Sequence, residues 1–357
     1  MNPKVLAIFA MALVFIAALG AVFYMHRIGE RDVLVERNTE VAGTEDEGEK
    51  SRRSPEGREC ANPERRPIAV MIAEDQEARP LSGIAFADIV IEMPVVTGSI
   101  TRMMAIFICE DSEEIGSIRS ARHDFIPLAQ GYDAIFAHWG GSQLALDEFR
   151  KGVIDNLDAM PNYFETFYRK EGIFAPHDGF TSMERMLRAA ENLGYRMTTN
   201  FEGYKLLNFK PQIPNLKQIP NTKPKKLEIN YKYPYNVRYD YNMEANSYRR
   251  WRGGAEEIDA LNGEQVETKN VVVMRAKSRQ IGGGYNDVDI LGSGEAVIYR
   301  NGEEIKGSWV KKSAEDALIF LDKAGEEIAF APGKIWIEVV EPSTIVNYEL
   351  WIMNNEL

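Results

Sequence analysis

The sequence predicts an α/β domain at residues 67–205 followed by a mostly antiparallel β domain at residues 227–357, with one transmembrane helix ahead of both. Three observations support this fold class. Short apolar runs alternate with helical patterns in the first half, which is the order of an α/β domain. Alternating, aromatic-rich runs follow a proline-rich connector in the second half, and an uninterrupted apolar segment lies near the N-terminus.

The apolar segment Val5–Met25 contains no charged residue, and a helix of about 20 residues crosses the hydrocarbon core of a bilayer. We therefore expect residues 1–28 to anchor the protein in the plasma membrane. A cleavable signal peptide is the alternative, because Ala18–Gly20 resembles a processing site, but the apolar run continues beyond it. No cysteine ends the run, which excludes a thioether-linked lipid at that position. Positive residues on both sides leave the orientation open.

Two stretches have no hydrophobic period. Residues 29–66 are rich in Glu, Arg, Gly, Ser and Asp and bury too little apolar surface to offset the entropy of ordering, so we predict a disordered tether. Residues 206–226 hold four prolines and several lysines, which predicts an extended connector between the two domains.

In the first domain, apolar runs bounded by Gly, Pro, Asp or Ser predict strands, and periodic stretches predict helices. Serines 120, 142 and 182 stand at N-cap positions, so the helix starts would offer free N–H groups that favour anions. The predicted strands are Ile68–Ala73, Ile89–Met93, Ile100–Cys109 and Ala134–Ala137, and the predicted helices are Ala121–Gly131, Gln143–Lys151 and Ser182–Asn192.

In the second domain, alternating runs separated by turn residues predict an antiparallel sheet. Gly282–Gly284 is not followed by a helical pattern, which favours a flexible or bulged connection over a phosphate loop. The predicted strands are Tyr231–Tyr241, Val271–Met274, Glu295–Tyr299, Leu318–Asp322 and Ile335–Val340.

Charge and cysteine content limit the possible partners. The net charge of −12, from 54 acidic and 42 basic residues, argues against nucleic acid, which requires a concentrated positive field. Cys60 and Cys109 are the only cysteines, too few for a disulfide scaffold. We expect one buried thiol and one thiol in the linker; the alternative, in an oxidising compartment, is a single disulfide between them.

Three of the four histidines, His123, His138 and His177, lie within a 55-residue stretch, each in a phrase of small and polar residues. Such phrases after apolar runs are typical of a cleft at the ends of strands, where glycine admits close approach and His, Arg and Asp supply protons. A zinc site formed by these histidines with Asp124 or Asp178 has acceptable ligand types, but the spacing lacks paired histidines or dithiols. We therefore expect no metal and no cofactor.

The acid and base candidates each have a structural alternative. Glu92 ends an apolar strand and is either an acid of raised pKa beside Arg102, Arg119 or Asp124, or one member of an ion pair with the nearby arginines. His138 is either a general base or a cap on its strand.

The residues after His138 also have two interpretations, one catalytic and one structural. In the catalytic interpretation, the backbone N–H groups of Gly140 and Gly141 would hold an oxyanion. Ser142 is a weak nucleophile candidate whose role as an N-cap is a sufficient explanation.

His177 follows a proline and precedes Asp178, which favours a side chain facing the same cleft; a turn closed by an Asx interaction is the alternative. Arg102, Arg119 and Arg122, with Ser120 between them, are candidates for bidentate binding of a carboxylate or phosphate, for which guanidinium is well shaped. Solvated surface arginines are the alternative.

The order of several phrases resembles the YerB-like lipoproteins, a bacterial envelope family defined by a domain of unknown function. The likeness covers about residues 66–340. The first-half phrases are Pro67–Ile72, Ala78–Gly83, Ala87–Glu92, Ile100–Arg102, Ile115–Arg122, His138–Ser142 and Ala175–His177, and the second-half phrases are Lys269–Met274, Gly292–Ala296, Gly307–Trp309 and Pro332–Ile337.

The resemblance implies a two-part protein on the extracytoplasmic face of the bacterial plasma membrane, and it implies little about mechanism. Two features depart from the family. Members usually carry a lipid on a cysteine, whereas this chain has an apolar helix in that place. The segment Gly253–Asp259 has acids where a histidine is expected in relatives, which puts the role of that loop in doubt.

Two functions follow as hypotheses. The first is a membrane-anchored hydrolase or lyase acting on peptidoglycan or another wall glycan or peptide, with Glu92 or His138 as acid or base, His177 and Asp124 as partners, and the arginines orienting an anionic group. The second is a non-catalytic binding or scaffold protein that recognises an anionic wall fragment or a partner protein. An enzyme requires these groups to converge, whereas a scaffold leaves them dispersed.

Overall fold

The computed structural model describes residue 60 and residues 62–96, 100–207 and 226–349. All of them fall within one compact unit. The predicted anchor at residues 1–28 and most of the predicted tether and connector lie outside the described residues. Within the described ranges, no helix has the length and apolar character needed to cross a membrane.

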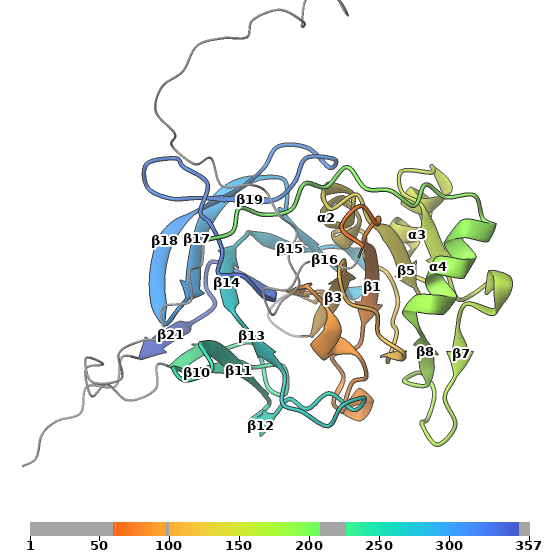
Figure 1. The fold of residues 1–357 in the computed structure, drawn as a ribbon, viewed down its shortest axis with the longest axis horizontal. Helices are drawn as coiled ribbons and strands as arrows, with labels where there is room; N and C mark the ends of the chain where they lie inside the picture. Colours follow the sequence, from red (N-terminus) through yellow and green to blue (C-terminus); the bar gives the residue numbers. More distant parts are fainter. Residues whose placement is uncertain (1–59, 61, 97–99, 208–225, 350–357) are drawn as a thin grey trace, which may run out of the picture. The chain divides into compact units, whose positions relative to one another are not determined.

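Both halves of the chain build one ten-stranded sheet (Figure 1). Strand β20 of the second half pairs in parallel with β2 of the first half, so the two halves join in the middle of the sheet. The order across the sheet is β19 (Ile319–Leu321), β18 (Glu303–Lys311), β17 (Gly292–Arg300), β14 (Asn270–Arg275), β20 (Ile335–Val340), β2 (Ile89–Pro94), β3 (Thr101–Phe107), β1 (Ile68–Ile72), β5 (Ile135–His138) and β6 (Asn156–Asp158).

The predicted fold class is confirmed in part. The first half contributes a mixed sheet, because β1 pairs in parallel with β5 and antiparallel with β3. The second half is mainly antiparallel, although β14 and β20 pair in parallel. The central strands β1, β2, β3, β5 and β20 are buried along their whole length, as expected for strands covered on both faces.

A second sheet packs against one face of the first. Its Leu227 and Tyr239 share a core with Val90 and Trp336 of the ten-stranded sheet. The predicted single strand Tyr231–Tyr241 was wrong, because Pro234, which has no N–H to donate, lies in a turn between two strands. The strands are β12 (Ala255–Glu256), β11 (Ser247–Arg252), β10 (Val237–Asn242), β9 (Lys226–Ile229) and β21 (Val346–Glu349), with β13 (Glu267–Thr268) also paired to β11.

Three short α-helices lie in the described part of the first half: α2 (Phe125–Gly131), α3 (Gln143–Arg150) and α4 (Met183–Asn192). Ser142 and Ser182 cap α3 and α4 as predicted, since each Oγ accepts from the N–H three residues on, at 3.3 Å. Ser120 is not an N-cap, because α2 begins at Phe125. The residues that precede α2 form β-bridges and a turn instead.

Smaller elements complete the described part. Gly282–Gly284 is a 3-10 helix that forms the connection of a hairpin between β15 (Ser278–Gln280) and β16 (Asn286–Val288), in agreement with the prediction of a connection and not a phosphate loop. A three-stranded sheet and three further short 3-10 helices lie in the first half. These are β4 (Ile115–Gly116), β8 (Gly179–Thr181), β7 (Tyr168–Arg169), η1 (Gln76–Ala78), η2 (Ile84–Phe86) and η3 (Tyr163–Glu165).

Cys60 and Cys109 form a disulfide, with their Cα atoms 4.9 Å apart. The expectation of two separate thiols was therefore wrong, and the alternative is correct. The bond attaches the segment that precedes β1 to the segment that follows β3, and both cysteines belong to the hydrophobic core. Sequence spacing cannot show that two Cα atoms approach this closely.

Candidate functional site

Three arginines gather where the parallel strands β1 and β5 end and the antiparallel strand β3 begins. Arg102 is the second residue of β3. The segment that carries Arg119 and Arg122 crosses the ends of β1 and β5: Arg119 donates its N–H to Met71 at 2.9 Å, and its carbonyl accepts from Trp139 at 3.1 Å. We call Arg102, Arg119 and Arg122 the arginine cluster.

Arg102 is the buried member of the arginine cluster, with 4% of its surface exposed. Its Nη1 donates to the carbonyl of Ser120 at 3.3 Å. Among the described residues, no carboxylate lies within ion-pairing distance of it. Burial and the like charges of Arg122 and Arg119 together lower the pKa of Arg102 to about 9, although the charges of Asp75 and Glu74 oppose the shift. Arg102 is thus a buried cation beside two others, and no described acid forms an ion pair with it.

The other two members are partly exposed. Arg119 forms an ion pair with Asp75 at 3.1 Å. Arg122 donates to the carbonyls of Ser120 and Ala121 and lies over the Tyr285 ring at 5.1 Å, and it pairs with no acid among the described residues. The Nε atoms of all three arginines are buried and have no hydrogen-bond partner in the described structure. Buried donors are almost always satisfied in folded proteins, so three in one cluster indicate a place for an acceptor.

His177 lies beside the arginine cluster. Its Nδ1 is 4.0 Å from the Asp75 carboxylate that also holds Arg119. Arg119 further donates to the carbonyl of Pro176 at 3.4 Å. Asp178 turns away and pairs with Arg169 at 2.6 Å. Of the predicted residues, the structure thus brings together the three arginines, Ser120 and His177, but not Asp178.

Glu92 lies elsewhere, in a buried ionic network between the two sheets. Arg250 and Arg252 of β11 both pair with its carboxylate, the latter through Nη1 at 3.0 Å. Arg252 also pairs with Glu74 at 2.6 Å, and Arg250 reaches Glu338 at 3.3 Å. We call Glu74, Glu92, Glu338, Arg250 and Arg252 the buried ionic network.

The predicted surroundings of Glu92 were wrong, although an ion pair is present. Burial opposes its ionisation, but Arg252 and Arg250 outweigh burial and hold the pKa of Glu92 below its usual range. Arg102 is opposite Met93 in the β2–β3 register, while Glu92 is opposite Met103. Side chains of successive residues point to opposite faces of a sheet, so Glu92 and Arg102 leave β2 and β3 on different sides.

His138 is fully buried at the end of β5. Its Nδ1 is 2.8 Å from the Gly140 carbonyl, its Nε2 is 3.2 Å from the Asn156 side chain, and its ring stacks on Phe149. Burial lowers its pKa. With both nitrogens engaged and no exposed surface, the geometry agrees with the strand-cap alternative.

The loop after His138 is used structurally. The Gly140 N–H, predicted to hold an oxyanion, donates to Asp158 at 2.9 Å. Gly141 forms a β-bridge with Ala121. Ser142 caps α3 through Oγ. The bridge from Gly141 ties the loop to the segment that carries Arg119 and Arg122.

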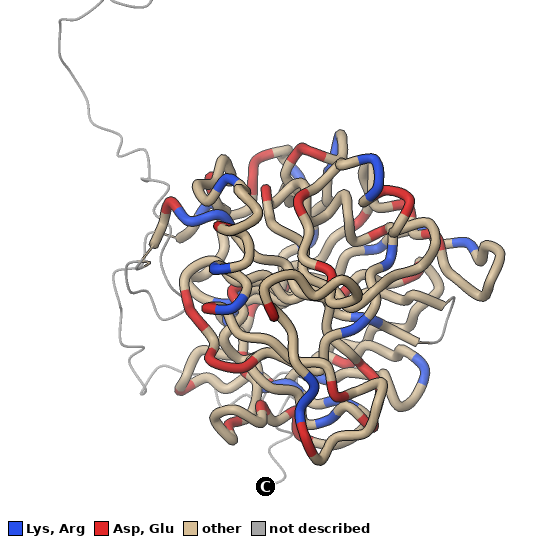
Figure 2. The backbone as a smooth tube through the Cα atoms, turned by 90° about the vertical axis from the view of Figure 1, so that its right-hand side faces the viewer, with Lys and Arg blue, Asp and Glu red and all other residues tan. Residues whose placement is uncertain are grey.

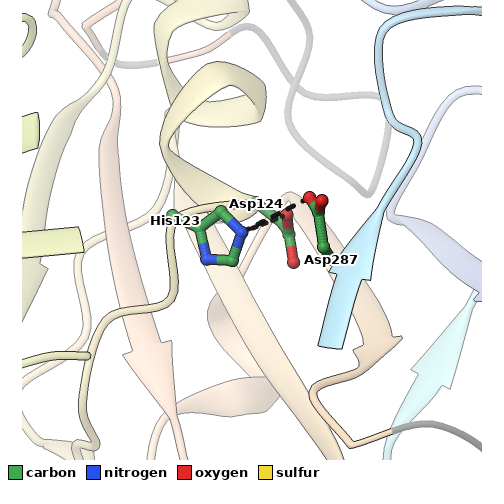
Figure 3. A group of neighbouring side chains, drawn as sticks. All are labelled: His123, Asp124 and Asp287. Atoms are coloured by element: carbon green, nitrogen blue, oxygen red, sulfur yellow. Dashed lines mark ion pairs between the residues drawn. The ribbon is translucent and has the colours of Figure 1, made fainter. Parts of the chain in front are cut away.

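Asp124 and His123 lie together near the β15–β16 hairpin, with Asp287 of β16 beside them (Figure 3). Burial and the charges of Asp287 and Asp289 raise the pKa of Asp124 to about 7, while an N–H from Val288 opposes the rise. The three histidines of the predicted site have different partners, so the structure does not assemble them into one centre.

Sequence reasoning missed the second-half partners. Arg250 and Arg252 are two residues apart on one strand and therefore face the same side of the sheet. Two arginines in this pattern can pair with the same buried acid. Arg252 also lines a pocket of about 440 Å³, together with residues from both halves including Arg79, Tyr233 and Glu257. The segment Gly253–Asp259 helps to line it, and Asp259 accepts N–H groups from Gly83 and Ala85.

Comparison with known families agrees with the two-half organisation. Residues 55–196 match the family model described as "Protein of unknown function (DUF3048) N-terminal domain", and residues 227–337 match the corresponding C-terminal domain. The chain belongs to the DUF3048 family. The YerB-like resemblance seen in the sequence is thereby confirmed.

One curated relative is described as "Putative lipoprotein YerB" of Bacillus subtilis strain 168; it is 31% identical over 282 residues, which cover 78% of this chain and 82% of the relative. A crystal structure of the YerB protein from Bacillus subtilis matches with a TM-score of 0.72 at 28% identity, over 83% of this chain and 99% of that one. The DUF3048 fold is therefore shared, and its family description names no activity.

Proposed function

We propose that this DUF3048 protein is a cell-envelope binding protein that recognises an anionic group, a phosphate or a carboxylate, through the arginine cluster. One observation carries the proposal: Arg102 is almost completely buried beside two further arginines without an acid partner among the described residues. Guanidinium groups bind phosphate and carboxylate bidentately, so such a ligand would satisfy the unpaired Nε donors.

The arginine cluster is a local feature and does not belong to a generally basic surface. Basic and acidic positions are interspersed over the described chain (Figure 2), and the whole sequence carries a net charge of −12. A ligand attracted by overall charge alone would be a cation. Selective binding of an anion here therefore depends on the directed donors of three arginines.

Two features support an extracytoplasmic location at the membrane. The Bacillus relative is described as a lipoprotein, and disulfides such as Cys60–Cys109 persist mainly in oxidising compartments. Both cysteines of the sequence are in that disulfide, so neither is free to carry a lipid. We therefore propose that the apolar run Val5–Met25 holds the chain at the membrane. The anionic groups within reach would then include those of the cell wall.

Binding is favoured over catalysis because the two proposed acid–base groups are occupied. Glu92 is enclosed by two arginines, and His138 is buried with both nitrogens engaged. A general acid or base must reach the proton that it transfers. Neither side chain is placed to do so, whereas Arg119 and Arg122 are partly exposed.

The test is co-sedimentation of the full-length chain, purified in detergent, with purified bacterial cell walls. Arg102→Met and Arg122→Met should each weaken binding about tenfold or more, because each removes a charge-assisted contact of about 1.5–3 kcal/mol. Arg150→Met is the matched control, since Arg150 is exposed on α3 and pairs only with Asp147 among the described residues. Equal retention of all three variants on the wall would contradict the proposal.

The same incubations also address the enzymatic alternative. Soluble wall fragments are analysed by mass spectrometry after incubation with the wild type, Glu92→Gln and His138→Ala. The proposal expects no released product. Products that disappear in either variant would establish a wall-acting enzyme and replace the binding proposal.

A further inference from the structure

His123, Asp124 and Asp287 direct three ligand atoms toward one point (Figure 3). The Nε2 of His123 is 3.2 Å from an oxygen of Asp124 and 3.4 Å from an oxygen of Asp287. All three atoms lie within 4.8 Å of one another. Nitrogen and oxygen ligands at about 2.0–2.1 Å from Zn²⁺ in a tetrahedral site are separated from each other by about 3.4 Å. The observed separations are close to that spacing.

The same separations fit a simple ion pair less well. A charge-assisted N–H···O contact has a length of about 2.7–2.9 Å, and both contacts of His123 are longer. The imidazole also faces two carboxylates at once, as it would if all three side chains bound the same cation. Imidazole nitrogen and carboxylate oxygen are both preferred ligands of Zn²⁺.

The charge balance supports a cation at this point. Asp124 is 5% exposed, and among the described residues no Lys or Arg lies within 4.0 Å of its carboxylate. Asp287 pairs with Arg279, whose side chain is largely exposed. A carboxylate buried next to another carboxylate is costly unless a positive charge compensates both. A divalent ion would provide that charge at the centre of the group.

The backbone of both halves of the chain holds the three ligands in place. His123 and Asp124 directly precede α2 in the first half, and Asp287 is on β16 in the second half. The neighbouring Asn286 fixes the hairpin to the end of β2: its N–H donates to Val95 at 3.0 Å and its side chain donates to Pro94 at 3.2 Å. The three ligands are thus carried by elements that are themselves hydrogen-bonded into the fold.

We infer that His123, Asp124 and Asp287 form a binding site for a divalent transition-metal ion of the Zn²⁺ class. This departs from the expectation of no metal, which considered His138 and His177 as co-ligands. Three protein ligands leave at least one coordination position for water or a ligand atom. The site is independent of the anion-binding proposal, because none of its three ligands belongs to the arginine cluster.

The experiment uses the full-length chain in detergent, freed of metal with EDTA and titrated with Zn²⁺ against a chromophoric chelator. The wild type should bind one tight equivalent. His123→Gln, Asp124→Asn and Asp287→Asn should each weaken that equivalent about 100-fold or remove it, since even supporting residues of metal sites change affinity about 10–100-fold. Zn²⁺ should also raise the melting temperature of the wild type, because it binds the folded state only.

Two variants serve as controls. His177→Gln and Asp289→Asn alter a histidine and an acid outside the site, and both should keep the tight equivalent and the thermal shift. If Asp124→Asn does not fold, Asp287→Asn provides the same test at a more exposed position. Absence of tight Zn²⁺ binding by the wild type, or unchanged binding by folded His123→Gln and Asp287→Asn, would overturn the inference.

Discussion

Glu92 and Glu338 lie opposite each other on the neighbouring parallel strands β2 and β20, and both carboxylates are fully buried. Arg250 from the second sheet pairs with both acids. The two acids come from different halves of the chain, so this contact joins the halves through charge as well as through backbone hydrogen bonds. Two adjacent buried acids require a cation between them, a proton on one of them, or both.

Replacing Arg250 by Met should therefore be strongly destabilising. Removing one partner of a buried ion pair costs about 3–5 kcal/mol, because the remaining charges stay desolvated. Arg249→Met is the matched control: Arg249 is the preceding residue of β11, half exposed, and pairs with Glu267, which predicts a loss of about 1 kcal/mol or less. Denaturant unfolding gives both values. Equal stability of the two variants would show that the network contributes no specific stabilisation.

Stability should fall as pH rises from about 5 to 8. Burial raises the pKa of Glu74 to about 8 and that of Glu338 to about 7, although Arg252 and Arg250 respectively oppose the rise. Their ordinary value is 4.5, so across this window the folded state holds protons that the unfolded state has released. Unfolding then releases protons, and higher pH favours it.

Glu338→Gln tests this pH effect. The groups that face Glu338 are Glu92, Arg250, Arg252, Tyr231 and Tyr239, and none of them is altered. Unfolding free energies measured between pH 5 and 8 should decline less steeply for the variant than for the wild type. Glu92, with its lowered pKa, contributes in the opposite direction and only below its ordinary value. A wild type whose stability does not change over this range would contradict the assignment.

The Cys60–Cys109 disulfide should stabilise the fold by about 2–4 kcal/mol, because it closes a long loop in the unfolded chain. The two residues are 49 positions apart. The double variant Cys60→Ser/Cys109→Ser should lose that amount in a denaturant titration, and reducing agent should have the same effect on the wild type. The variant itself should not respond to reducing agent. Reduction without any loss of stability would argue against the bond.

His138→Ala should reduce stability without weakening anion binding. The substitution removes a buried ring that stacks on Phe149 and contacts Gly140 and Asn156, which predicts a loss of about 2–4 kcal/mol. The arginine cluster would keep its donors below the melting temperature. Binding to cell walls is measured at low temperature alongside thermal unfolding. Loss of binding in a folded His138→Ala protein would return His138 to the functional site.

Much of the strand content was predictable because buried strands appear in the sequence as short apolar runs. Ile68–Ala73, Ile89–Met93 and Ile335–Val340 were predicted to within one residue of the observed strands. The pairing of β20 with β2 was not predictable, because side-chain pattern identifies a strand but not its neighbour across more than 240 residues.

The arginine cluster was predictable from residue type and position, since Arg102 and Arg119 flank strand ends. The partners of Glu92 were not, because Arg250 and Arg252 approach from a different sheet. Ser120 shows a local limit: a serine ahead of an apolar pattern was taken as a helix start, but bridges with β1 and the Gly141 loop hold this segment extended.

The most direct test of the central claim is isothermal titration of the full-length chain with inorganic phosphate, for the wild type and Arg102→Met. We predict saturable binding of one phosphate per chain by the wild type and its loss in Arg102→Met, with Arg150→Met unchanged. Absence of phosphate binding by the wild type, together with absence of binding to acetate as a carboxylate, would contradict an anion site at the arginine cluster. So would binding that Arg102→Met retains at full strength.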